Sequence, residues 1–314
     1  MNKPIRIIFA GTPDFSAPYL EGLIADSDFS VLGVITQSDK PSGRKQELSP
    51  SPVKIIALEK GLRIWQPEKL RKDETIAGEL EAIGADMLVV VAYGQIIPQN
   101  ILDLFPRGAI NVHPSLLPKY RGASPIQSAI LNGDSDTGIT IMLMDEKMDH
   151  GPILAQERFV LTGDETNESL HAKLAPLGVR LLIGTIKRYL AGKIKPQPQD
   201  DSQATLSAAI AKEDGRINWE SSAQLIKQRI FAFHPWPGTW TTLEGRRMKI
   251  FPPVIVMDGE SDGSGRLQIV DSELVAGCGN GRLILTRIQL EGKGIVSAKD
   301  FMRGHKEIEG KNLI

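Results

Sequence analysis

Two polar side chains stand two residues apart at the end of an apolar run, Asn111 and His113 in the stretch INVHPSLLPKYRG. Residues two apart in a β-strand lie on the same face, so both side chains would point to one side of a sheet. An amide can donate a hydrogen bond to an oxyanion, and an imidazole can carry a proton between reacting groups. The pair is a candidate for acyl-type chemistry; the ordinary alternative is a core histidine bonded to one carbonyl.

A second polar cluster, MDEKMDHG at 144–151, follows another apolar run. A carboxylate beside an imidazole fixes its tautomer and stabilises its cation, a role that suits Asp149 beside His113. Together with Asn111 they predict direct transfer of an acyl-type group to an amine, with no Ser or Cys nucleophile. A metal site built from His113, Asp149 and His150 is the alternative, but no H-x-x-H or C-x-x-C spacing supports it.

The segments that would carry these residues alternate between strand-like apolar runs and helix-like segments with apolar residues every three or four positions. Such alternation predicts βαβ units in an α/β domain, with a Rossmann-like, mostly parallel sheet and helices on both faces. Ligands of such a sheet bind at the carboxyl ends of its strands, where Asn111 and His113 would lie. The predicted strands span residues 5–11, 30–36, 62–65, 86–93, 108–114 and 138–144.

The first predicted turn, FAGTPDF, does not fit a dinucleotide site, because it has one glycine instead of the G-x-G-x-x-G series that clears space for a pyrophosphate. The sheet is therefore expected to be Rossmann-like in organisation only.

The C-terminal third changes character. A helix predicted at 166–191 is followed by a Pro-, Gln- and Asp-rich segment without periodicity. Short apolar runs separated by Gly-rich turns then predict a small antiparallel barrel or sandwich. The expected organisation is a catalytic domain at 1–191, a linker at 192–206 and a second domain at 207–314.

Composition sets outer bounds on function. The 314 residues suffice for two domains, and 41% hydrophobic with 24% charged residues is typical of soluble globular proteins. No apolar run approaches the roughly 20 residues of a membrane helix, and the N-terminus is predicted to be a strand, not a signal peptide. The single cysteine, Cys278, excludes an internal disulfide framework and suits the cytoplasm. A net charge of −1 excludes an overall basic field, so any nucleic-acid contact must be local.

The polar residues together resemble a known signature. Asn111, His113, the Ser-Leu-Leu-Pro at 115–118, Gly122 and Asp149 are similar to the pattern of the folate-dependent formyltransferases. The resemblance implies that 10-formyltetrahydrofolate is the formyl donor and that no metal is needed. It also implies catalytic roles for Asn111, His113 and Asp149.

In that family the folate pterin typically lies in a pocket lined by loops at the strand ends. By position these loops are 91–98, 115–118 and 142–149, and their apolar lining suits a flat heterocycle. The folate-binding residues implied are Val91, Tyr93, Gly94, Ile96, Ser115, Leu116, Leu117, Pro118, Met144 and Asp145.

The acceptor is implied by a different stretch. Over nearly its whole length the chain resembles family members that formylate the α-amino group of methionine on initiator methionyl-tRNA, for translation initiation. Segment 36–54 is by itself a Pro-, Gly- and Ser-rich solvated loop, but in the family such a loop reaches the tRNA acceptor end, with Arg44 at the matching position. The second domain would be an OB-like β-barrel with a further tRNA surface. The implied tRNA contacts are Lys40, Arg44, Lys45, Arg246 and Arg247.

Other readings stay open. A formyltransferase acting on an amino-sugar nucleotide would use the same Asn-His-Asp centre, and the basic loop and barrel argue only weakly against it. An RNA-binding module without catalysis would keep tRNA but form no product, and Arg246 and Arg247 fit an ordinary solvated strand edge equally well. With no evident assembly segment, a cytoplasmic monomer is expected.

Overall fold

The computed structural model describes residues 3–42, 47–257, 259 and 261–314, and internal contacts divide the chain into two units. Two short segments within residues 1–207 belong to unit 2, so no single cut separates the units. The domain limits 1–191, 192–206 and 207–314 stay a prediction. Unit 1 consists of Met1–Pro125, Thr137–Phe159 and His171–Ser207; unit 2 consists of Ile126–Asp136, Val160–Leu170 and Ala208–Ile314.

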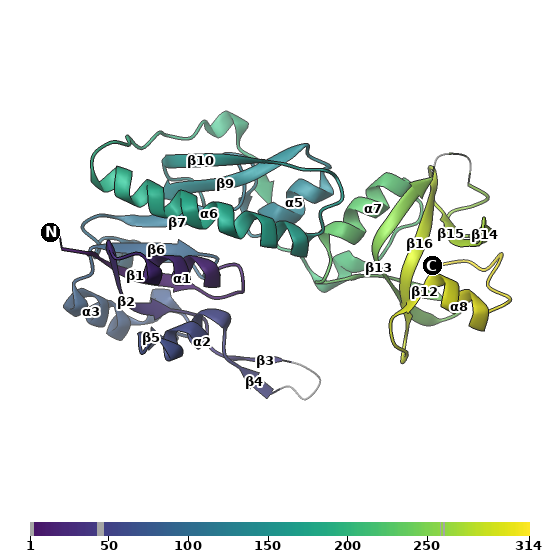
Figure 1. The fold of residues 1–314 in the computed structure, drawn as a ribbon, viewed down its shortest axis with the longest axis horizontal. Helices are drawn as coiled ribbons and strands as arrows, with labels where there is room; N and C mark the ends of the chain where they lie inside the picture. The colour runs from purple at the N-terminus through teal and green to yellow at the C-terminus, as the bar shows by residue number, and fades with distance from the viewer. Residues whose placement is uncertain (1–2, 43–46, 258, 260) are drawn as a thin grey trace. The chain divides into compact units, whose positions relative to one another are not determined.

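Unit 1 is built on a seven-stranded sheet in the order β10-β9-β7-β6-β1-β2-β5 (Figure 1). The pairs from β7 through β5 are parallel, whereas β7 and β9 are antiparallel. The fold class predicted from the alternating pattern is confirmed. The strands are β1 (Ile5–Gly11), β2 (Phe29–Ile35), β5 (Arg63–Trp65), β6 (Met87–Val91), β7 (Ala109–His113), β9 (Asp136–Leu143) and β10 (Ile153–Val160).

Helices cover the sheet because its central strands are apolar on both faces. Every residue of β6 is buried, and alternate residues of β1 and β6 (Ile8, Ala10, Leu88 and Val90) join a core cluster that also contains Leu80 of helix α3. Burial of both faces is what the continuous apolar runs predict. The helices of unit 1 are α1 (Ala17–Ala25), α2 (Pro52–Glu59), α3 (Glu74–Ile83), α4 (Gln99–Leu102) and most of α6 (Asn167–Leu190), and α1, α2, α3 and α6 lie along the sheet in Figure 1. Helix α5 (Pro125–Leu131) belongs to unit 2 from Ile126 onward.

Three local features differ from the sequence-based expectation. The strand expected at 86–93 ends at Val91, which leaves Tyr93 and Gly94 in the following loop. Strand β10 was not anticipated, because its exposed alternate residues make it less apolar than the central strands. The solvated loop expected at 36–54 contains a short hairpin of β3 (Lys40–Ser42) and β4 (Glu47–Ser49).

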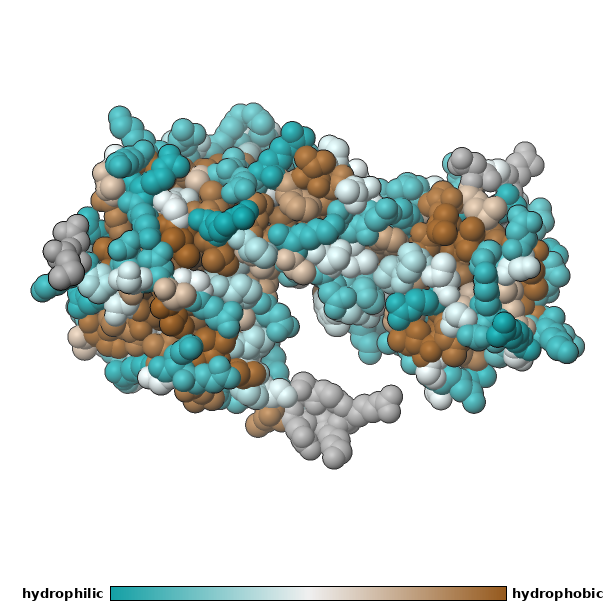
Figure 2. All heavy atoms as spheres, in the orientation of Figure 1, coloured by the Kyte–Doolittle hydropathy of each residue, from teal (hydrophilic) through white to brown (hydrophobic). Residues whose placement is uncertain are grey.

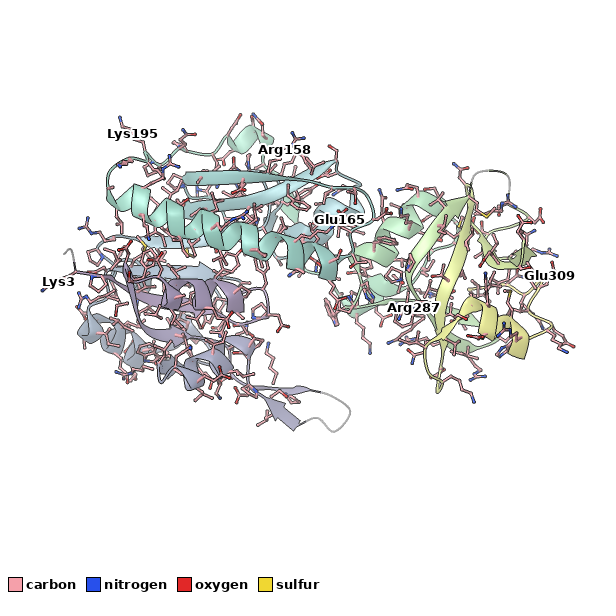
Figure 3. The ribbon with its side chains drawn as sticks, viewed as in Figure 1. Lys3, Arg158, Glu165, Lys195, Arg287 and Glu309 are labelled. Carbon is pink, nitrogen blue, oxygen red and sulfur yellow. The ribbon has the colours of Figure 1, made fainter. Side chains whose placement is uncertain are left out.

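The segment expected to be a linker lies along unit 1 and forms a strap, defined here as residues 192–207. Gln197 pairs with Ile153 of β10 through both backbone hydrogen bonds. Further along, β11 (Leu206–Ser207) pairs in parallel with β8 (Arg121–Gly122). Lys195 of the strap and Arg158 of β10 project from the same side of unit 1 in Figure 3. The strap is therefore part of the architecture of unit 1.

Unit 2 is dominated by an antiparallel sheet in the order β12-β13-β16-β15-β14, with β17 paired to β16. The C-terminal segment bonds to both ends of this order, since Ile314 pairs with Thr242 of β12 and Lys311 accepts from Leu267 of β14. The strands are β12 (Thr239–Leu243), β13 (Arg246–Met257), β14 (Leu267–Val270), β15 (Glu273–Gly277), β16 (Arg282–Leu290) and β17 (Val296–Ser297), with helices α7 (Ala223–Ala232) and α8 (Ala298–Gly304).

Polar and apolar residues are mixed over the face of the molecule drawn in Figure 2. Across the described ranges, the helices lack the combination of length and apolar character that crossing a membrane requires.

Candidate active site

Asn111 and His113 lie in the C-terminal half of β7, the strand between β6 and β9. Asn111 pairs with Val90 of β6 and Met142 of β9, and His113 pairs with Thr140 of β9. His113 is only 4% exposed, whereas Asn111 is half-buried. The two-residue spacing puts both side chains on one face of the sheet, with the imidazole buried and the amide half-buried.

Asp149 reaches both side chains from the loop between β9 and β10. Its Oδ1 accepts a hydrogen bond from Asn111 Nδ2 at 3.1 Å and lies 3.5 Å from His113 Nδ1. Its Oδ2 accepts from the backbone N–H of Gly122 at 2.8 Å. The structure thus brings together the three residues that the sequence singled out.

The orientation of His113 comes from a backbone carbonyl. Its Nε2 lies 2.9 Å from the carbonyl oxygen of Tyr120, which can only accept, so the hydrogen of the neutral ring is on Nε2. Nδ1 then presents its lone pair beside Asp149. A proton taken up at Nδ1 would lie next to a carboxylate, which stabilises the imidazolium.

His150 has different partners. Its Nδ1 lies 2.8 Å from Asp145 Oδ2 and its Nε2 lies 3.4 Å from Asp201 Oδ2. The hydrogen bond from Arg121 holds the pKa of Asp201 below its ordinary value, so this acid is ionised at neutral pH. Within the described ranges, no three His, Cys, Asp or Glu side chains are arranged to hold a metal ion.

The predicted folate residues from the 91–98 and 142–149 loops fall into buried and exposed sets. Val91 and Tyr93 are buried, and burial raises the pKa of the Tyr93 phenol. Met144 packs on the same core cluster as Tyr93, and Asp145 is bonded to His150. The remaining two, Gly94 and Ile96, are exposed.

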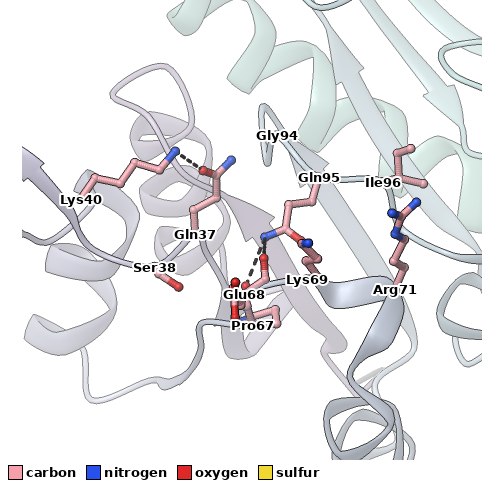
Figure 4. A pocket seen from close by; sticks show the side chains of 10 residues that line it. All are labelled: Gln37, Ser38, Lys40, Pro67, Glu68, Lys69, Arg71, Gly94, Gln95 and Ile96. Atoms are coloured by element: carbon pink, nitrogen blue, oxygen red, sulfur yellow. Dashed lines mark hydrogen bonds between the residues drawn. The ribbon is translucent and has the colours of Figure 1, made fainter.

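Gly94 and Ile96 line an open cleft of about 560 Å³ at the carboxyl ends of β2, β5 and β6 (Figure 4). Polar and cationic side chains form much of the remaining wall. The other lining residues are Gln37, Ser38, Lys40, Pro67, Glu68, Lys69, Arg71 and Gln95. We call this cleft, whose lining residues begin at Gln37 and end at Ile96, the 37–96 cleft.

The Ser-Leu-Leu-Pro loop, Ser115, Leu116, Leu117 and Pro118, lies against β9 and β10. Thr140 of β9 donates to the carbonyl of Ser115 at 2.6 Å and accepts from the amide of Leu117 at 3.1 Å. Gln156 of β10 donates to the carbonyl of Leu117 at 2.9 Å. Among the described residues that line the 37–96 cleft, none comes from 115–118. The loop is thus anchored structurally beside His113.

The predicted tRNA contacts lie in two places. Lys40 begins the β3–β4 hairpin, lines the cleft and donates to Gln37 Oε1 at 2.6 Å; Arg44 and Lys45 lie outside the described residues. In unit 2, Arg246 donates to the carbonyl of Glu291, and the guanidinium of Arg247 lies 3.9 Å from the ring centroid of Trp240.

Sequence reasoning missed the residues that support the trio from behind. Gln199 of the strap donates to the backbone carbonyls of Asp149 and Gly151. Thr205 accepts from the amide of Tyr120, the residue whose carbonyl orients His113. Both lie in a segment without periodicity, so no pattern in the sequence pointed to either residue.

Comparison with known proteins finds matches over nearly the whole chain. The family model for formyl transferases matches residues 4–186, and that for the formyl transferase C-terminal domain matches residues 209–306. Methionyl-tRNA formyltransferase of Pseudoalteromonas translucida is 42% identical over 98% of this chain and 96% of its own length. The protein of the same name from Myxococcus xanthus is 42% identical over 99% and 98%.

A solved structure is similar in fold at much lower identity. The sugar 3N-formyl transferase WlaRD, crystallised in the presence of dTDP and 5-N-formyl-THF, has a TM-score of 0.65 at 19% identity. The similarity covers 93% of this chain and 100% of that one. At this identity the similarity shows the fold alone.

Proposed function

The chain belongs to the formyl transferase family, and from that premise we propose that it transfers the formyl group of 10-formyltetrahydrofolate to the α-amino group of methionine on initiator methionyl-tRNA. Two relatives that cover nearly the whole chain at 42% identity carry the name of that activity. Its place would be the cytoplasm, where translation begins, and we propose that it acts as a monomer.

The observation that carries the chemistry is the convergence on Asp149 Oδ1 of Asn111 Nδ2, at 3.1 Å, and His113 Nδ1, at 3.5 Å. One N–H of the Asn111 amide is bonded to Asp149, and among the described residues no second acceptor of this amide is found, so its other N–H can donate to the oxygen of the formyl group. That donor stabilises the oxyanion formed when the amine attacks the formyl carbon, an effect typically worth about 3 kcal/mol.

His113 would move the proton. The attacking amine loses a proton to Nδ1 as the new C–N bond forms, and Asp149 stabilises the imidazolium so formed. The same proton passes to the leaving nitrogen of the folate as the old C–N bond breaks, so His113 returns to its starting state. General acid–base catalysis of this kind contributes about 10²- to 10⁴-fold.

For the donor, we propose that the folate contacts Val91, Tyr93, Gly94, Ile96, Met144 and Asp145, with Ser115, Leu116, Leu117 and Pro118 shaping the site beside His113. The 37–96 cleft supports this proposal, since it opens along Gly94 and Ile96 at the carboxyl edge of the sheet. For the acceptor, we propose contacts from Lys40, Arg44 and Lys45, and from Arg246 and Arg247 in unit 2. No metal takes part in the proposed reaction.

An amino-sugar nucleotide is the other acceptor to weigh. Its support here is a fold similarity at 19% identity, against 42% for the tRNA enzymes. The two are separated by acceptor competition. Purified protein and labelled 10-formyltetrahydrofolate are incubated with charged initiator tRNA, with the same tRNA uncharged, and with a dTDP-amino sugar. We expect label only on the charged tRNA; label on the sugar nucleotide would replace the proposed acceptor.

A further inference from the structure

The Asp149 loop is held from outside by one side chain of the strap. This loop joins β9 to β10, and its neck is closed by the hydrogen bond from the amide of Leu143 to the carbonyl of Pro152, at 2.9 Å. Asp149 itself has φ +50°, a left-handed conformation that non-glycine residues seldom adopt. A residue in that conformation keeps its place only where its surroundings fix it.

Gln199 supplies that fixation through both hydrogens of its amide. Nε2 donates to the carbonyl oxygen of Asp149 at 2.9 Å and to that of Gly151 at 2.8 Å. These two carbonyls belong to the residues directly before and after His150. Gln199 thus binds the backbone of Asp149, while the carboxylate of Asp149 contacts Asn111 and His113.

The other end of the same amide is bound by Arg121. Oε1 of Gln199 accepts from Arg121 Nε at 3.0 Å and from Arg121 Nη2 at 2.8 Å. Arg121 is only 8% exposed and also donates to Asp201. A guanidinium has only donors and a backbone carbonyl only accepts, so one orientation of the Gln199 amide satisfies all four contacts.

The Gln199–Arg121 pair therefore reaches Asp149 from two directions. Arg121 directly precedes Gly122, whose N–H donates to Asp149 Oδ2. Gly122 has φ +118°, and a Cβ there would collide with the carbonyl oxygen of Ser207, so strap and β8 fit closely at this point. The hydrogen-bonded pair of Gln199 and Arg121 thus connects the backbone of Asp149 to Gly122, whose N–H donates to the Asp149 carboxylate.

We propose that Gln199 is a positioning residue for the transfer reaction: with Arg121, it fixes the distance and angle at which Asp149 meets Asn111 and His113. The role rests on the proposed function of the trio. Gln199 touches no reacting atom, so its removal should slow the chemical step and leave substrate binding in place. Misplacement of a catalytic group by a fraction of an ångström to 1 Å can cost up to about 100-fold in rate.

Two substitutions test the role. Gln199→Glu keeps the acceptor for Arg121 but sets carboxylate oxygens against the two carbonyls, and Gln199→Met keeps the approximate shape without any hydrogen bond. Gln197→Glu is the matched control, because Gln197 lies on the same strap, is exposed, and is seen to bond through its backbone alone among the described residues. For each, kcat and both KM values are measured together with the thermal unfolding temperature.

We expect both Gln199 variants to lower kcat by about 10- to 100-fold, with KM for folate and for tRNA within about twofold of wild type. Gln197→Glu should match wild type. A kcat within twofold of wild type in either folded Gln199 variant would overturn the proposal, as would a loss confined to KM.

A second readout does not depend on the acceptor. The ¹⁵N resonances of the His113 ring, assigned by their loss in His113→Ala, report the contact with Asp149 in the protein alone. They should move in Gln199→Met and stay unchanged in Gln197→Glu. Unchanged His113 resonances in Gln199→Met would contradict the positioning role even if the tRNA were the wrong acceptor, so the two proposals fail separately.

Discussion

The catalytic trio and the β3–β4 hairpin with its cleft are built in opposite ways. In the trio, His113 is nearly buried, and each reactive side chain is held by a backbone group or a neighbouring polar side chain. In the cleft, Gln37 is the one hydrogen-bond partner of the Lys40 side chain among the described residues, and within the same ranges no hydrogen bond or ion pair is found for the exposed side chains of Lys69 and Arg71.

The difference matches what the two regions are proposed to do. Stabilising a transition state requires donors fixed before the substrate arrives. Holding an anionic substrate requires positive charge on side chains that can adjust. Substitutions in the first region should therefore act on kcat, and substitutions in the second on KM.

The largest effect is expected at His113. His113→Ala removes the proton carrier and should lower kcat by about 10³-fold, within the range usual for general acid–base catalysis. Steady-state kinetics with charged initiator tRNA measure it. His305→Ala, in unit 2, is the control and should keep wild-type kcat; a His113 variant at one tenth of wild type or better would remove the proton role.

Asn111 comes next. Asn111→Ala removes one donor to the oxyanion, which should cost about 10²- to 10³-fold in kcat with KM nearly constant. The exposed Asn100 at the start of α4 provides the control Asn100→Ala. If the loss at Asn111 is found in KM alone, the amide binds ground state and transition state equally, and the assignment fails.

A smaller effect of the other kind is expected in the cleft. Lys40→Ala should raise KM for the tRNA by about 2- to 5-fold, leave kcat unchanged and reduce the dependence of KM on salt. Lys195→Ala removes an exposed lysine of the strap and serves as control. A fall in kcat for Lys40→Ala would break the division between the two regions.

The smallest effect is expected on thermal stability, at the ion pair of Asp39 and Lys54, the residues that flank the β3–β4 hairpin in sequence. Hydrogen bonds from Lys54, at 2.6 Å, and from Gln66 hold the pKa of Asp39 below its ordinary value. A carboxyl whose pKa is lower in the folded state stabilises the fold above its unfolded pKa of about 4, and that contribution is lost as pH falls through the folded value.

Because the pair is partly exposed, Asp39→Asn should lower Tm by only about 1–2 °C at pH 7, and this difference should shrink as pH falls below about 4, through the lowered pKa of Asp39. Scanning calorimetry across this pH range measures the difference. Lys54→Met removes the partner and should give the same pH dependence; a Tm difference between Asp39→Asn and wild type that persists at pH 2 would show that the pair is not its source.

The sequence predicted the features that repeat along the chain. The six strands expected in the first domain are present, since buried parallel strands need continuous apolar runs such as MLVVV. The helix expected at 166–191 is α6, Asn167–Leu190, with Ser169 N bonded to Thr166 Oγ1 at its start.

Isolated polar contacts were beyond such reasoning. Two-residue spacing indicates that Asn111 and His113 share a face, but no periodicity shows that Tyr120 returns its carbonyl to His113 or that Gln199 reaches Asp149 across 50 residues. The segment PQPQDDSQ was interpreted as a linker because its composition lacks a buried face. Its contacts are hydrogen bonds to backbone carbonyls and to the Arg121 side chain, which leave no hydrophobic pattern in a sequence.

The central claim is that the chain moves a formyl group by means of this trio, and single-turnover transfer tests it most directly. Excess enzyme is mixed with labelled 10-formyltetrahydrofolate and charged initiator tRNA, and label in N-formylmethionine is followed in wild type, Asn111→Ala and His113→Ala of equal Tm. The account predicts rapid labelling by wild type and a rate at least about 100-fold lower in each variant. Labelling at the wild-type rate in either folded variant would contradict it.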